Sequence, residues 1–178
     1  VWADALWTSA CGKGRWLGRV ENLAQEIRAK DDETLWGFSA MKRRDLVEYA
    51  RERLVWQRGH RGAPPETIAE SAQVLDPNVM TLGFARRFAE YKRPNLLLTQ
   101  PDRLALLLLN SERPVQIIVA GKAHPEDEVG LQMVQAWTQF VNRSDVRARA
   151  VFLEDYDMAI AQQLVQGVDL WINTPRRP

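Results

Sequence analysis

A cluster of positive charges follows an apolar, strand-like segment near the middle of the chain. Arg86, Arg87 and Lys92 come just after Gly83, and the pattern predicts that they open a helix at the carboxyl end of a strand. Helix N-termini bind anions, because their first N–H groups have no partner within the helix and carry partial positive charge. Cations at such a position are unfavourable unless something negative or open solvent faces them. We interpret the cluster as a phosphate clamp; the alternative is a solvated basic surface, with Glu90 neutralising part of its charge.

A second candidate segment contains Gly121, Lys122 and His124, and it also follows a predicted strand. Glycine permits a tight turn or the close approach of a ligand, and the two other side chains could face the same edge of the sheet as the clamp. An ordinary strand-to-helix turn explains this segment equally well. Since His124 has no partner at a spacing suited to metal binding, we predict no metal site.

A third segment, Glu154–Asp157, places a tyrosine among carboxylates after another predicted strand. Asp155 or Asp157 is expected to cap the helix that follows. The hydroxyl of Tyr156 could point at a bound group, and the residues alone leave this open.

The order of apolar runs predicts the fold that positions these segments. Apolar residues recur at helical spacing between about residues 15 and 57. Beyond them, strands expected at 79–84, 115–120, 150–153 and 168–172 alternate with helices at 94–109 (broken at Pro101), 126–141 and 158–166. Such alternation is typical of an α/β fold, a Rossmann-like parallel sheet with flanking helices. Ligands bind at the carboxyl ends of strands in open sheets of this kind, so the three segments should share one edge.

Two regions are expected. Residues 1–75 should form a mainly helical lead-in segment, and residues 76–178 an incomplete Rossmann-like half-domain that binds phosphate groups. The chain does not begin with methionine and stops just past a predicted strand, which favours a piece of a larger enzyme. The alternative is a natural terminus with a frayed tail.

Composition narrows the class of protein. A chain of 178 residues, 46% of them hydrophobic, can bury a core. A formal net charge of +1 argues against broad binding to nucleic acid. The single cysteine, Cys11, excludes an internal disulfide framework and fits a reducing compartment. No signal-peptide pattern is visible, and the longest apolar run is too short to span a bilayer. We therefore expect a cytoplasmic protein without nucleic-acid or membrane partners.

Three motifs resemble the α-glucan phosphorylases, the family of glycogen, starch and maltodextrin phosphorylases. The motifs are GFARRFAEYKR at 83–93, GKAHP at 121–125 and FLEDYD at 152–157, and residues 173–178 also have a counterpart in the shorter bacterial and archaeal members. The resemblance is close from about Asp76 to Pro178 and looser before it. It implies a two-domain GT-B fold, with this chain lying around the C-terminal Rossmann-like domain.

The resemblance also implies an activity and roles for individual residues. The family carries pyridoxal 5′-phosphate (PLP) and uses orthophosphate to cleave α-1,4-glucans, releasing α-glucose 1-phosphate. The matching positions assign Arg87 and Lys92 to the substrate phosphate, and Arg86 and Tyr156 to the cofactor. Asp157 stands where the animal enzymes have an arginine, which leaves a second cofactor contact there in doubt. The family's Schiff-base lysine lies outside this chain, so we expect the chain alone to be inactive. A homodimer of the full-length protein is a further expectation.

Two other functions stay open on the sequence alone. A sugar-nucleotide-dependent glycosyltransferase, similar to glycogen synthase, shares the fold and also uses an Arg/Lys pair on a diphosphate. A non-catalytic glucan-binding module would bind glucan without releasing glucose 1-phosphate. Dependence on a nucleoside-diphosphate sugar would identify the first, and glucan affinity without phosphorolysis the second.

Overall fold

The computed structural model describes residues 2–15, 17, 20–174 and 176. The chain divides into two compact units, Val1–Met41 and Lys42–Pro178. The division lies within helix α3 (Asp32–His60), which begins in the first unit and ends in the second. The expected domains at 1–75 and 76–178 stay a prediction about the whole protein. Within the phosphorylase-like segment 173–178, residues 175, 177 and 178 lie outside the described residues.

The first unit is helical. Its helices before α3 are α1 (Trp2–Cys11) and α2 (Val20–Arg28). The carboxylate of Asp31 accepts hydrogen bonds from the backbone N–H and the hydroxyl of Thr34 at 2.7 and 2.9 Å, and these bonds lower the pKa of Asp31. Trp7 packs edge-on against Phe38 with 5.7 Å between the ring centroids. An acidic cap and an aromatic contact thus stabilise this unit.

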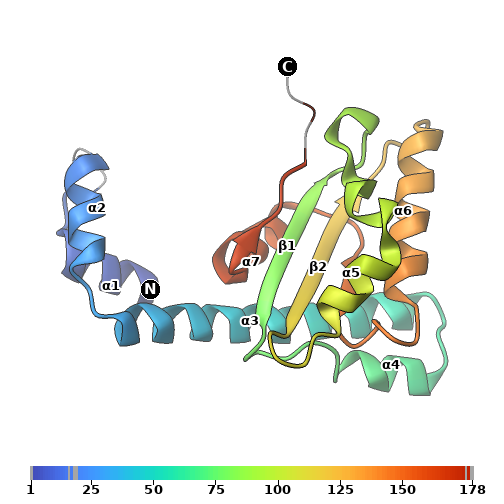
Figure 1. Cartoon of the computed structure of the whole chain (residues 1–178), viewed down its shortest axis with the longest axis horizontal. Coiled ribbons are helices and arrows are strands. Elements are labelled where there is room, and N and C mark those ends of the chain that lie inside the picture. The colour runs from blue at the N-terminus through green and yellow to red at the C-terminus, as the bar shows by residue number, and fades with distance from the viewer. Residues whose placement is uncertain (1, 16, 18–19, 175, 177–178) are drawn as a thin grey trace. The chain divides into compact units, whose positions relative to one another are not determined.

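The second unit is a four-stranded parallel sheet with helices on both faces (Figure 1). In the order β3-β2-β1-β4, its strands are β1 (Met80–Arg87), β2 (Val115–Lys122), β3 (Ala150–Leu153) and β4 (Leu170–Trp171). The helical elements are α4 (Pro65–Ser71), the 3₁₀ turns η1 (Glu90–Lys92) and η2 (Pro94–Thr99), α5 (Pro101–Leu108), α6 (Glu128–Val141) and α7 (Met158–Gly167). The predicted α/β, Rossmann-like fold class is confirmed.

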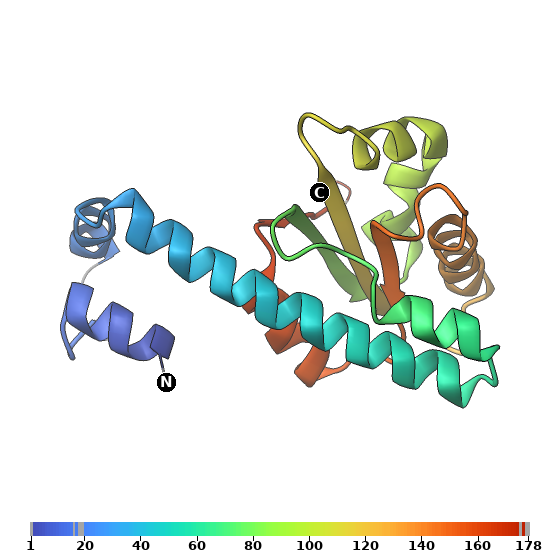
Figure 2. The same ribbon diagram turned by 90° about the horizontal axis from the view of Figure 1, so that it is seen from below.

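Two apolar layers bury the faces of this sheet. One face packs against α3 and α7, through residues such as Leu46 and Leu164. The other packs against α5 and α6, through residues such as Leu108 and Trp137. Figure 2 shows α7 (red) on one side of the strands and α6 (orange-brown) on the other. Each layer excludes water from one face, as expected for a parallel sheet.

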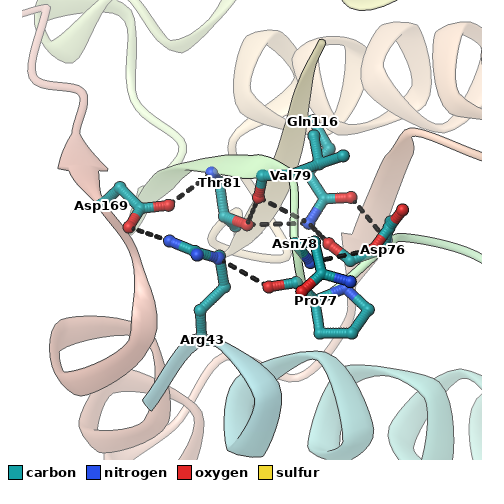
Figure 3. A network of polar contacts seen from close by, with 8 residues as sticks. All are labelled: Arg43, Asp76, Pro77, Asn78, Val79, Thr81, Gln116 and Asp169. Carbon is teal, nitrogen blue, oxygen red and sulfur yellow. Dashed lines mark hydrogen bonds and ion pairs between the residues drawn. The ribbon is translucent and has the colours of Figure 1, made fainter. Parts of the chain in front are cut away.

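A closed polar network lies at the amino ends of β1 and β2 (Figure 3). The amide of Gln116 donates to the hydroxyl of Thr81 at 2.7 Å and to the carbonyl of Asp76 at 2.9 Å. The guanidinium of Arg43 pairs with the carboxylate of Asp169 at 2.5 Å, and this carboxylate also accepts the backbone N–H of Thr81 at 2.7 Å. We call these five residues the amino-end network. It ties α3 and the start of β4 to the centre of the sheet.

A side chain of α3 forms hydrogen bonds with the outer edge of β3. Gln57 of α3 is buried, and its amide donates to the carbonyl of Phe152 at 3.2 Å and accepts the N–H of Glu154 at 3.0 Å. A backbone residue of a neighbouring parallel strand would bond in the same way to two residues that flank one position. Gln57 therefore takes the place of a further strand at the carboxyl end of β3.

The segment that carries the cations folds differently from the prediction. Strand β1 continues past Phe84 to Arg87, because Arg86 and Arg87 pair in register with Gly121 and Lys122 of β2. The prediction that the cations open a helix is therefore wrong, since Arg86 and Arg87 belong to a strand. Lys92 lies in the short turn η1 instead.

Other elements follow the prediction more closely. The expected break at Pro101 is confirmed, since η2 and α5 are separate. The predicted bounds of β3, 150–153, are those observed. Among the described residues, no helix is both long and apolar enough to cross a membrane.

Candidate functional site

The carboxyl ends of the four parallel strands form one edge of the sheet, which we call the rim. Arg86 and Arg87 end β1, Lys92 follows in η1, Lys122 ends β2, and Tyr156 follows β3. All strand pairs are parallel, so these positions lie at the same end of the sheet. The structure therefore brings the three sequence segments to one edge, as expected.

The two arginines lie on opposite faces of the sheet, because successive strand residues alternate. Arg86 is half-buried and shares the face of Phe84, which packs against α5 and α6. Arg87 is exposed, lies on the α3–α7 face and is in register with Lys122, which is also exposed. Like charges on directly opposed strand residues repel each other. Arg87 and Lys122 thus favour an anion or solvent between them.

A tight apolar contact fixes the backbone beside Arg87. Phe88 is 0% exposed, and its N–H donates to the carbonyl of Lys122 at 2.9 Å. A Cβ atom on Gly121 would lie 2.2 Å from the ring of Phe88 and 2.5 Å from the carbonyl oxygen of Arg86. No larger residue fits there without movement, so the glycine of the second motif has a packing role. The close contact sets where the chain leaves the rim.

Lys92 is held in a short, strained turn. Its ammonium lies 5.5 Å from the centroid of the Tyr91 ring. The next residue, Arg93, has a φ of 44°, a left-handed conformation that costs a non-glycine residue about 1–3 kcal/mol. The hydroxyl of Thr174 donates to the carbonyls of Lys92 and Arg93 at 3.0 and 2.9 Å. Thr174 belongs to the phosphorylase-like segment 173–178, but no local pattern predicts its contact with the distant Lys92.

Tyr156 lies on the face of Arg87. It is half-buried and packs against the apolar cluster between the sheet and helices α3 and α7. The family resemblance groups Tyr156 with Arg86, which lies on the other face, so the structure does not bring those two together directly. Asp157 accepts the N–H of Ile160 at 2.9 Å and caps α7, which confirms the capping prediction.

Glu154 is the carboxylate nearest the end of β3. It forms an ion pair with Arg61 at 2.8 Å. Burial raises the pKa of the Glu154 carboxyl above its ordinary value, and the guanidinium of Arg61 opposes that rise. Glu154 is therefore engaged by α3 and the loop after it, away from the cations of β1.

Within the part of the chain that the structure describes, Arg86, Arg87, Lys92 and Lys122 have no carboxylate partner. Glu90, expected to neutralise part of this charge, forms an ion pair with Arg176 at 3.2 Å. No group of three or more His, Cys, Asp or Glu residues that could hold a metal ion occurs in residues 2–15, 17, 20–174 and 176. Guanidinium and ammonium groups suit phosphate oxygens, so the rim is chemically matched to phosphate.

The amino-acid sequence is similar to several phosphorylases. It is 42% identical over the whole chain to glycogen phosphorylase of Mycobacterium tuberculosis (strain CDC 1551 / Oshkosh), of which it covers 21%. It is 41% identical over 89% of the chain to glycogen phosphorylase of Aquifex aeolicus, covering 23% of that protein. It is 37% identical over 92% of the chain to maltodextrin phosphorylase of Thermococcus litoralis, covering 20% of that protein. No family model matches.

The chain aligns over most or all of its length with these glycogen and maltodextrin phosphorylases. It spans about a fifth of the length of the curated relatives it matches. The resemblance carried by the three motifs is thereby confirmed. The Rossmann-like parallel sheet agrees with the GT-B fold of this phosphorylase family.

Proposed function

We propose that the full-length protein containing this chain cleaves α-1,4-glucans with orthophosphate and releases α-glucose 1-phosphate, with PLP as cofactor. The observation that carries the proposal is the positive charge at the rim, which has no carboxylate partner among the described residues, in a chain similar to phosphorylases along its whole length. Because the chain spans about a fifth of those relatives, we expect no turnover by the chain alone. The expected cytoplasmic location and the homodimer belong to the same proposal.

In this proposal Arg87 and Lys92 bind the substrate phosphate. Arg87 offers planar, paired N–H donors to two phosphate oxygens, whereas Lys92 offers a compact charge. The buried Phe88 beside Arg87 and the hydroxyl of Thr174 beside Lys92 restrict both backbones before the phosphate binds. Charges that are already in place stabilise a transition state without a cost of reorganisation. This stabilisation is usually the largest contribution to the rate at such sites.

The rim also suits the phosphate group of PLP, since its donors are cations and a phenol rather than carboxylates. We assign Arg86 to this phosphate and Tyr156 to the lining of the cofactor site, with the two residues on opposite faces of the sheet. When bound, the cofactor supplies a phosphate that exchanges a proton with the substrate phosphate. Two phosphates held close together repel each other strongly, and the cations of the rim lower that repulsion.

The test uses the full-length enzyme and measures release of glucose 1-phosphate from maltodextrin at saturating orthophosphate. Arg87→Ala and Lys92→Ala are each expected to lower the rate by about 10²–10³, as for other preorganised charged donors. Arg103→Ala, which truncates an exposed arginine of α5, is the matched control and should leave the rate unchanged.

Two outcomes contradict the proposal. One is a loss smaller than about threefold in both rim variants, since the removed groups would then do little in the transition state. The other is activity that depends on a nucleoside-diphosphate sugar, which would support the glycosyltransferase alternative.

A further inference from the structure

The segment after β4 contacts the turn that carries Lys92. The pairing of β4 with β1 continues at Ile172, whose N–H donates to the carbonyl of Gly83 at 2.8 Å. Two residues later, the hydroxyl of Thr174 lies 3.0 Å from the carbonyl oxygen of Lys92 and 2.9 Å from that of Arg93. The pairing of β4 with β1 thus places this hydroxyl at the rim.

Further contacts join the same two segments. The guanidinium of Arg93 donates through Nε to the carbonyl of Thr174 at 3.1 Å. The N–H of Arg176 donates to the carbonyl of Tyr91 at 3.2 Å, and its guanidinium pairs with Glu90 at 3.2 Å. A three-residue 3₁₀ turn has few internal hydrogen bonds, and those have poor geometry. The turn therefore depends on contacts from outside itself.

The hydroxyl of Thr174 contacts the strained point of the turn. The carbonyl of Lys92 belongs to the peptide before the Cα atom of Arg93, and the carbonyl of Arg93 belongs to the peptide after it. One hydroxyl that contacts both oxygens constrains both peptide planes, and so both backbone angles of Arg93. This contact offsets part of the cost of its left-handed conformation, in which φ is 44°.

The far side of the turn is anchored in the core. Pro94 is buried, and its carbonyl accepts the indole N–H of the fully buried Trp137 at 3.0 Å. Phe88 anchors the near side. Between these two anchors, the hydroxyl of Thr174 contacts the backbone of Lys92 itself.

From this geometry we propose that Thr174 is a positioning residue for the phosphate site, holding the backbone of Lys92 where its ammonium can meet the phosphate. The inference rests on the function proposed above. It assigns to the hydroxyl of Thr174 no contact with phosphate, glucan or cofactor. Its effect on phosphate passes through Lys92 alone.

The experiment compares Thr174→Val, which removes the hydroxyl and keeps the shape, with Thr174→Ser, which keeps the hydroxyl. Thr99→Val is the matched control, because the Thr99 hydroxyl also donates to a nearby backbone carbonyl, that of Leu96 at 2.7 Å. In the full-length enzyme, Thr174→Val is expected to raise the KM for orthophosphate about tenfold, the size of one lost hydrogen bond. The KM for maltodextrin should stay unchanged. Thr174→Ser and Thr99→Val should keep both constants.

Amide hydrogen exchange of the same proteins separates this inference from the proposed function. Faster exchange at Lys92 and Arg93 in Thr174→Val, and not in Thr174→Ser, supports the positioning role whatever reaction the enzyme catalyses. Unchanged exchange overturns it, even in an active phosphorylase. Equal changes of the two KM values, or a serine variant as impaired as the valine variant, also overturn it. A wild-type enzyme without phosphate-dependent turnover contradicts the proposed function and leaves the exchange result to decide the role of Thr174.

Discussion

The two ends of the parallel sheet differ in the burial and the pairing of their charged side chains. In the amino-end network Arg43 is 3% exposed and Gln116 is 0% exposed, and each has partners within hydrogen-bonding distance. At the rim Arg87 and Lys122 are exposed and, in the part of the chain that the structure describes, lack a carboxylate partner. Among the described residues, the cation at one end has a carboxylate partner and those at the other end have none.

This difference separates residues that hold the fold from residues that are available to a ligand. A buried charge costs several kcal/mol unless it is paired, so the fold itself requires the partner of Arg43. Exposed cations keep most of their hydration, and packing does not require them. A cluster of them at the ligand-binding edge of an open sheet is better explained by an anion than by stability.

The largest expected effect is a change in the free energy of unfolding, compared between a residue of the amino-end network and a residue of the rim. Arg43→Ala leaves the carboxylate of Asp169 without its cation, and should lower the free energy of unfolding by about 3–5 kcal/mol. Arg87→Ala, the matched truncation at the rim, should change it by less than about 0.5 kcal/mol. Urea denaturation of both variants and the wild type measures the two values. Similar losses in the free energy of unfolding of the two variants would show that Arg87 also stabilises the fold.

A smaller effect concerns the packing beneath the rim. In Gly121→Ala the new methyl group would meet the ring of Phe88, and the resulting overpacking should cost about 1–3 kcal/mol. Gly59→Ala is the matched control, because Gly59 lies in α3 with nothing within 4 Å of a Cβ atom. Alanine is the better helix former, so this variant should gain about 0.5–1 kcal/mol. Thermal unfolding measures both, and a neutral Gly121→Ala would show that Phe88 can move.

The smallest effect concerns the rim carboxylate Glu154. Burial raises its pKa above 4.5 despite the pairing with Arg61. The folded state therefore keeps this proton to higher pH than the unfolded state, and the free energy of unfolding falls as pH rises from 4.5 through the raised pKa. Glu154→Gln cannot titrate and should lose less stability than the wild type over that interval. Melting temperatures measured between about pH 3.5 and pH 7 test this, and parallel profiles would contradict it.

The elements that are buried on both sides were predictable from the sequence. Strand β3 is a run of four apolar residues, and all four are buried, so its bounds follow from composition alone. The end of β1 was not predictable in this way. Arg86 and Arg87 are polar, and they remain in the strand because β2 pairs with them, which a local pattern does not show.

The site was predictable only in part, for a related reason. Motifs located Arg86, Arg87, Lys92 and Tyr156, and their roles stay predictions. The alternation that separates Arg86 from Tyr156 depends on where β1 ends, and that end was predicted too early. The contact of Thr174 with Lys92 joins residues 82 positions apart. Such a contact follows from strand order, which the apolar pattern does not specify.

Gln57 has a consequence for encounters between molecules. An open strand edge is a template on which a second polypeptide can pair, and such pairing leads to aggregates. At the carboxyl end of β3, the carbonyl of Phe152 and the N–H of Glu154 are already bonded to one amide side chain. An incoming strand would have to displace that side chain before it could extend the sheet. Gln57 therefore opposes the pairing of a second polypeptide with this part of the sheet edge.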